Sequence, residues 1–123
     1  MAELARPFLP TRHFEQAKQF YLALGFELRL DGDVAIFGIG ASSFILQRPY
    51  EDMPEAHYMM QLMVDDLDAW WTKLAALDLA KLGAPPAKPP AMQPWGLRVA
   101  FVTDPSGVLW HVAERRPGVA HDR

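Results

Sequence analysis

The chain has 123 residues, half of them hydrophobic and 22% charged, which is the balance of one globular domain rather than of a disordered or membrane-spanning chain. Twelve lysines and arginines against 15 aspartates and glutamates give a net charge of −3 without a basic block, which argues against a nucleic-acid partner. There is no cysteine, no apolar run long enough to span a membrane and no pattern of a secretory signal, so we expect a cytoplasmic protein with no membrane partner.

The first part of the chain predicts one strand, one helix and three further strands. The strand is the short extended run 7–9, and the helix lies between His13 and Leu24. Apolar residues recur there at steps of three and four, as on one face of a helix, at Phe14, Ala17, Tyr21 and Leu24. The segments 26–30, 34–39 and 44–47 follow as three strands separated by turn signals.

The same order of elements recurs in the second part of the chain. A strand is expected within 58–64, and a second helical stripe consists of Leu67, Trp70, Leu74 and Leu77. Asp66 is a good N-cap for this helix, whereas His13 is a poor one for the first helix. A weak strand at 79–82 precedes a loop with five prolines, and a hairpin with strands at 98–103 and 108–114 ends the pattern.

The two copies are in register. All four positions of the first helical stripe recur 53 residues later, whereas Arg48 and Arg115, which follow the last strand of each copy, are 67 residues apart. The second copy therefore carries 14 extra residues, which we assign to the proline-rich loop. The sequence predicts an α+β fold of two βαβββ modules, about 5–48 and 57–115, within a single domain of residues 1–123.

Three phrases of the sequence, FEQAKQFYLALGFE, MVDDLDAWW and PWGLRVAFVTDPSGVLWHVAE, resemble the vicinal oxygen chelate superfamily. This superfamily includes glyoxalase I, extradiol dioxygenases and bleomycin resistance proteins. The third phrase is the most specific, and it is similar to the bleomycin-resistance branch. The resemblance implies curled mixed sheets that surround a cavity, commonly in a homodimer.

The resemblance also implies where a metal would bind. In metal-using members, four strand positions present His, Glu or Gln to a divalent ion. Carried over one by one, these positions are Arg6, Phe44, Met59 and His111, and of these only His111 can bind a metal. We therefore expect no metal and no cofactor. One alternative stays open, because His57 shares a strand face with Met59 and a shifted register would make His57 and His111 half of a metal site.

A cavity without a metal would be mostly apolar. Strand alternation predicts that it is lined by Phe8, Phe44, Leu46, Met59, Gln61, Met63, Leu109 and His111, with Arg6 nearby. Trp70, Trp71 and Trp110 are expected to support the fold. Trp95 lies between a proline and a glycine in a loop, where periodicity gives no reason for burial. In the resembling bleomycin resistance proteins, this tryptophan lines the ligand groove at the dimer interface.

The leading hypothesis is a metal-free, non-enzymatic protein that sequesters a planar or aromatic small molecule, as in antibiotic resistance. Its expected ligand-binding residues are Trp95, Phe44, Met59, Gln61, His111, Arg6, Phe8 and His57. The modest net charge argues against bleomycin, which is cationic, as the ligand. The alternatives are a metal-dependent lyase, isomerase or dioxygenase that uses His57, His111 and Glu114, and a dimeric accessory module without a small ligand.

Overall fold

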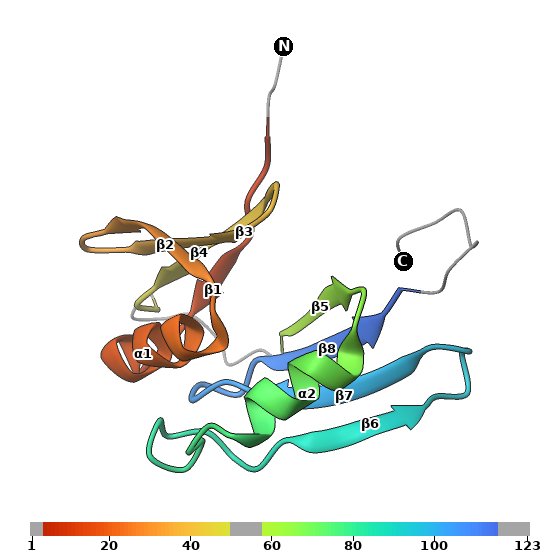
Figure 1. The fold of residues 1–123 in the computed structure, drawn as a ribbon. Helices are drawn as coiled ribbons and strands as arrows, with labels where there is room; N and C mark the ends of the chain where they lie inside the picture. The colour runs from red at the N-terminus through yellow and green to blue at the C-terminus, as the bar shows by residue number, and fades with distance from the viewer. Residues whose placement is uncertain (1–3, 50–57, 116–123) are drawn as a thin grey trace.

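The computed structural model describes residues 4–49 and 58–115, and it folds as strand, helix and three strands, twice (Figure 1). The first module contains β1 (Phe8–Pro10), α1 (Phe14–Leu24), β2 (Glu27–Asp31), β3 (Ala35–Ile39) and β4 (Ser42–Gln47). The second contains β5 (Met59–Val64), α2 (Leu67–Ala75), β6 (Lys88–Met92), β7 (Arg98–Thr103) and β8 (Leu109–Glu114). The predicted α+β fold of two βαβββ modules is confirmed.

Each module forms its own four-stranded mixed sheet. The strand order is β1-β4-β3-β2 in the first sheet and β5-β8-β7-β6 in the second. The first and last strands of each module pair in parallel, and the other pairs are antiparallel. Both sheets are curled without closing into a barrel, and each has its helix on one face (Figure 1). No helix in the described part of the chain is long and apolar enough to cross a membrane.

The helix ends follow local sequence signals. The Asp66 carboxylate accepts a hydrogen bond of 3.0 Å from the backbone N–H of Ala69, so it caps α2 as predicted. His13 makes no side-chain cap at the start of α1 among the described residues. Gly25 ends α1 with a φ of 97°, a left-handed conformation that a glycine adopts without strain.

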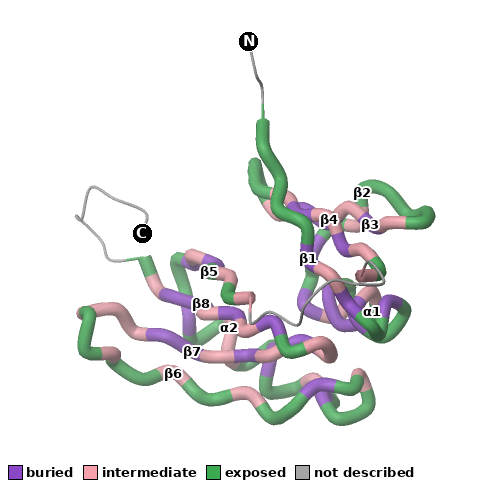
Figure 2. Tube along the Cα trace, turned by 180° about the vertical axis from the view of Figure 1, so that it is seen from behind, coloured by how far each residue is buried: buried purple, intermediate pink, exposed green. Residues whose placement is uncertain are grey.

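One hydrophobic core joins the two modules, because the helix-covered faces of both sheets contribute to it (Figure 2). At its centre the ring of Tyr21 contacts those of Phe20, Phe26, Phe37, Phe44 and Trp110. The Tyr21 hydroxyl donates to Asp104 Oδ2 at 2.7 Å and accepts a hydrogen bond from Trp110 Nε1 at 3.0 Å. Thr11 and Ser106 hydrogen-bond through their hydroxyls nearby. These bonds fix the first module against the β7–β8 turn.

The sixth strand differs from its prediction. Residues 79–82 form turns, and the strand is Lys88–Met92, inside the proline-rich segment. Pro89 and Pro90 are tolerated because β6 is an edge strand, in which half of the backbone groups need no strand partner. The register also shifts between Lys88 and Ala91, where the prolines interrupt the ladder.

Candidate functional site

Each sheet has one face that is free of its helix, and strand pairing defines which residues lie on it. Residues paired across neighbouring strands share a face, and the faces alternate along each strand. We call these two surfaces the first and the second open face. The first open face is formed by Phe8, Ile36, Gly38, Ser43 and Ile45. The second is formed by Met59, Gln61, Met63, Val99, Phe101, Thr103, Leu109, His111 and Ala113.

Three rings gather on the second open face. Trp95 stands in the turn between β6 and β7, which is closed by a 2.9 Å hydrogen bond from Gly96 N–H to the Gln93 carbonyl. Its ring centroid lies 6.2 Å from that of His111, and the Phe101 ring meets His111 edge-on at 4.8 Å. Trp95 is 55% exposed. The hairpin therefore holds a large aromatic ring over the sheet without burying it.

This aromatic platform stands beside a buried apolar floor. Val99 and Ala113 lie on the second open face, yet they are only 1% and 0% exposed. Neither belongs to the hydrophobic core between the modules. Met59, from the edge strand β5, is 64% exposed on the same face. The face thus combines an apolar floor, exposed aromatic and thioether groups, and the polar side chains of Gln61 and His111, which suits a flat ligand.

Sequence reasoning placed some of these residues correctly and missed one. Gln61 pairs with His111, so the two predicted polar residues lie side by side. Trp110 faces the core at 3% exposure, where it supports the fold as predicted. Phe101 was missed, although alternation along β7 from the paired Val99 places it on the face of His111. Predicted residue His57 lies outside the described residues.

On the first sheet, the predicted orientation of Phe44 and Leu46 is wrong. Both side chains face the core, at 2% and 0% exposure, and Ile45 shares the open face with Phe8. The prediction assumed that the 67-residue spacing between Arg48 and Arg115 also relates the last strands of the two modules. This assumption made Phe44 the counterpart of His111. Strand pairing instead makes Ile45 the counterpart of His111, a spacing of 66, because Phe8 pairs with Ile45 as Gln61 pairs with His111. A slip of one residue turns a side chain to the other face.

The residues present do not fit the divalent metal site that the family resemblance implies. With the corrected register, the four positions hold Arg6, Ile45, Met59 and His111, a set with one imidazole and a permanently charged guanidinium. Residues 4–49 and 58–115 contain no group of three His, Asp or Glu side chains that could hold a metal. Glu114 lies on the opposite face from His111, which counts against its predicted place in a metal site.

Glu114 has a structural position instead. Its Oε2 accepts a hydrogen bond of 3.1 Å from the backbone N–H of Leu67, at the start of α2. The same oxygen forms a 3.2 Å ion pair with Arg98, which also pairs with Asp68 at 3.0 Å. Both acids raise the pKa of the Arg98 guanidinium. This network ties α2 to β7 and β8 and explains Glu114 without a role in chemistry.

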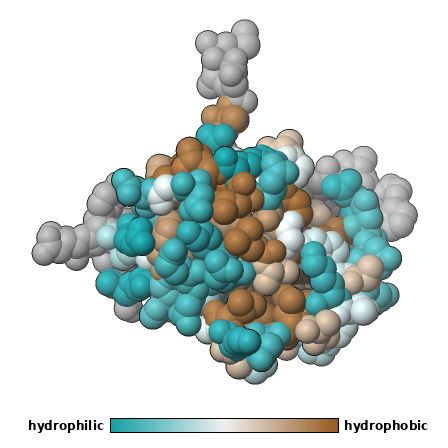
Figure 3. All heavy atoms as spheres, turned by 60° about the vertical axis from the view of Figure 1, so that its left-hand side comes forward, coloured by the Kyte–Doolittle hydropathy of each residue, from teal (hydrophilic) through white to brown (hydrophobic). Residues whose placement is uncertain are grey.

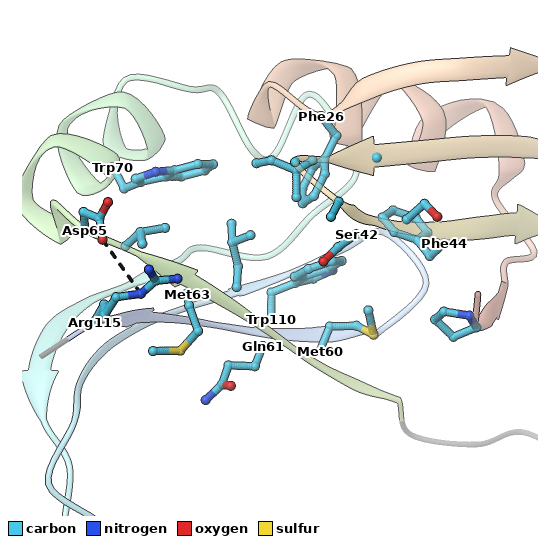
Figure 4. A pocket seen from close by; sticks show the side chains of 18 of the residues that line it. Phe26, Ser42, Phe44, Met60, Gln61, Met63, Asp65, Trp70, Trp110 and Arg115 are labelled. Carbon is cyan, nitrogen blue, oxygen red and sulfur yellow. Dashed lines mark ion pairs between the residues drawn. The ribbon is translucent and has the colours of Figure 1, made fainter. Parts of the chain in front are cut away.

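A cleft of about 1180 Å³ lies between the two modules, beside β5 and outside the packed core that joins them. Figure 4 shows Trp70, Trp110 and Phe26 around it, with the Asp65–Arg115 ion pair at one end. Gln61 and Met63 point to the other side of β5 from Trp110 (Figure 4). Trp70 is half-buried here, with Lys73 Nζ 5.2 Å from its ring centroid, so it is less buried than its helical stripe predicted. Of the predicted ligand-binding residues, the described lining includes Phe44 and Gln61.

The buried acid of the fold, Asp104, lies away from both open faces. Burial raises the pKa of its carboxyl, although hydrogen bonds from the Tyr21 hydroxyl and from backbone N–H groups of the turn oppose the rise. Burial also raises the pKa of Tyr21. Because both oxygens of Asp104 accept hydrogen bonds inside the fold, we assign it to holding the modules together.

Comparison with known proteins adds three findings. The model of the Glyoxalase/Bleomycin resistance protein/Dioxygenase superfamily matches residues 3–112. A bleomycin resistance protein of Klebsiella pneumoniae is 29% identical over 121 residues, which cover 89% of this chain and 90% of that protein. The fold is similar to that of the bleomycin-binding protein of Streptomyces verticillus in complex with copper(II)-bleomycin, with a TM-score of 0.72, 24% identity and coverage of 94% and 100%. It is also similar to a lactoylglutathione lyase of Agrobacterium tumefaciens, with a TM-score of 0.71, 21% identity and coverage of 92% and 94%.

Proposed function

Because the chain belongs to the glyoxalase/bleomycin resistance protein/dioxygenase superfamily, we propose that it binds a planar or aromatic small molecule without a metal and without covalent chemistry. The bound molecule would be an antibiotic or a compound of similar shape. The ligand lies on the second open face, against Trp95, Phe101 and His111. The similarity to bleomycin-binding proteins supports this proposal. Residues 4–49 and 58–115 contain no fitting metal-ligand set, which argues against the metal-dependent alternative.

The exposure of Trp95 is the observation that carries the proposal. A half-exposed indole, held by a tight hairpin turn above a buried apolar floor, contributes little to the core and presents a rigid aromatic surface. Stacking of a planar ring against such a surface contributes about 0.5–1.5 kcal/mol beyond burial. Gln61 and His111 are placed to orient polar groups of the ligand.

We further propose that the ligand groove is closed by a second copy of the chain. Both open faces expose large apolar side chains, including Phe8 at 52%, Met59 at 64% and Trp95 at 55%. A band of apolar surface, bordered by hydrophilic residues, is visible from the side of the first module (Figure 3). Exposed apolar surface on this scale marks an interaction site, and a two-fold partner would cover it.

Calorimetric titration with a neutral planar probe, anthraquinone-2-carboxamide, tests the binding proposal. The unmodified protein should bind the probe. Trp95→Ala should weaken binding by about 1–3 kcal/mol, the scale of removing an aromatic anchor. It should leave the melting temperature nearly unchanged, because Trp95 is half-exposed.

Met92→Ala is the matched control. Met92 is 67% exposed and belongs to the same hairpin, but it pairs with Arg98 and therefore lies on the other face of the sheet. This variant should bind the probe like the unmodified protein. If Trp95→Ala binds equally well, or if it unfolds the protein, the hairpin is a structural element and the proposed site is wrong.

A further inference from the structure

A row of polar residues crosses the first open face at one end of the sheet. Arg6, which extends β1, donates from Nε to Ser43 Oγ on β4 at 2.9 Å. Ser43 pairs with Gly38 on β3, and Gly38 pairs with Glu27 on β2. Arg29, also on β2, lies against Gly38. Two guanidinium groups therefore flank one pair of residues, Ser43 and Gly38.

Gly38 is required for the position of Arg29. A Cβ at Gly38 would overlap the Arg29 guanidinium, which occupies the space where any other residue would have a side chain. Arg29 is fixed there by hydrogen bonds to Glu27 Oε1 at 2.9 Å and to the Gly40 carbonyl at 3.0 Å. The Arg29 guanidinium is thus held on the open face rather than free in solvent.

The charge on the open faces is positive although the chain is negative. The described strands contain three acids, Glu27, Asp31 and Glu114. Asp31 forms an ion pair with Lys18, and Glu114 forms one with Arg98, both on the helix side of their sheets. Glu27 is therefore the acid on an open face in these strands. In the part of the chain that the structure describes, the open faces carry three positive charges. Arg6 and Arg29 lie on the first open face, and Lys88, which pairs with Phe101, lies on the second. One positive charge of the row is left without an acid beside it in the described strands.

We propose that the ligand is an aromatic acid. Its ring lies on the second open face of one protomer, and its carboxylate or sulfonate binds on the first open face of the other, between Arg6 and Arg29, where it accepts a hydrogen bond from Ser43. This inference rests on the proposed function and adds the chemical class of the ligand. Guanidinium groups bind such oxyanions through paired, charge-assisted hydrogen bonds. The anion would neutralise the charge of Arg6, which has no acid beside it in the described strands, whereas Arg29 already pairs with Glu27 at 2.9 Å. The same row disfavours a cationic ligand.

Three probes that share one ring system test the charge preference by calorimetry: anthraquinone-2-carboxylate, its neutral carboxamide and the cationic 2-(aminomethyl)anthraquinone. The acid should bind about tenfold more tightly than the amide, the effect of one charge-assisted hydrogen bond, and the amine should bind weakest. This preference should shrink as salt is added, because the row is open to solvent.

Arg6→Gln and Arg29→Gln should each remove most of the roughly tenfold preference for the acid, while the affinity for the neutral amide stays unchanged. Arg12→Gln, at an exposed arginine before α1, is the control and should leave all three affinities unchanged. Equal binding of the three probes, or tightest binding of the amine, would overturn the inference and leave the proposed function standing. If none of the probes binds, both are wrong.

Discussion

The hydroxyl of Tyr21 offers a sharp test of how the two modules are held together. We expect Tyr21→Phe to destabilise the protein although it removes a single atom and keeps the ring. The hydroxyl is the hydrogen-bond acceptor for Trp110 Nε1 and the donor to Asp104 Oδ2, and both partners are buried, at 3% and 1% exposure. The variant leaves an indole N–H and a carboxylate oxygen without these partners.

The magnitude follows from the cost of such groups. A buried polar group without a partner costs about 1–3 kcal/mol, and more if it is charged, so the two groups together predict a loss of about 2–6 kcal/mol. Packing contributes little to this loss, because the phenylalanine ring keeps the contacts to Phe26, Phe37 and Phe44. This loss is a large part of the stability of a domain of this size.

The loss should also depend on pH in a defined direction. Burial raises the pKa of Asp104 above its unfolded value, and the hydrogen bond from Tyr21 lowers it, so the variant has the higher pKa. A group with a raised folded pKa contributes stability that is fully present below the unfolded pKa, about 3.9, and is lost as pH rises through the folded pKa. The variant should therefore lose more stability between about pH 4 and pH 7 than the unmodified protein.

Urea unfolding of both proteins at the two pH values measures the effect. The difference in free energy of unfolding should be larger at pH 7, by about 1.4 kcal/mol if the variant's pKa is one pH unit higher. Trp110→Phe provides a double-mutant cycle, in which the shared hydrogen bond should appear as non-additivity. A pH-independent difference, or a variant as stable as the unmodified protein, would refute the assignment of Asp104 and Tyr21 to this role.

Four further outcomes are expected. Phe44→Ala should cost about 3–5 kcal/mol in thermal or urea unfolding, because Phe44 is a core residue at 2% exposure. Asp66→Ala should cost about 1 kcal/mol by the same measurement through loss of the α2 cap, and an unchanged stability would contradict the capping role. Elemental analysis of protein purified without added metal should find no stoichiometric Zn, Fe, Ni or Mn, whereas a tight ion lost on His111→Ala would favour the enzymatic alternative. Sedimentation should give about twice the mass of 13.9 kDa, and a monomer would remove the proposed groove.

Much of the fold could be predicted from sequence because its signals are local. Side chains three and four residues apart share a helix face, so the stripes containing Tyr21 and Leu74 identified both helices and their repeat. Alternation along a single strand was equally reliable, and it set Trp110 toward the core and His111 toward the open face. The Asp66 cap needed only the next turn of chain.

The candidate site was less predictable because it depends on pairing between distant segments. The face of Phe44 depends on which residue of β1 lies beside β4, and a spacing taken from arginines beyond the strands was wrong by one residue. The strand at Lys88–Met92 was missed because prolines are tolerated only in an edge strand. Whether a strand lies at the edge or the centre of its sheet cannot be predicted from the residues of that strand.

Sequence alone therefore determined the repeated elements and the residue types available for a site. Tertiary structure decided which of those residues meet. Tyr21 and Asp104 are 83 positions apart, and Arg29 lies on Gly38 only because β2 and β3 pair with a register shift beside it. The physical reason is that a helix stripe or a strand alternation is fixed by bonds and sterics within a few residues. The register between strands is fixed by the core and the ladder as a whole.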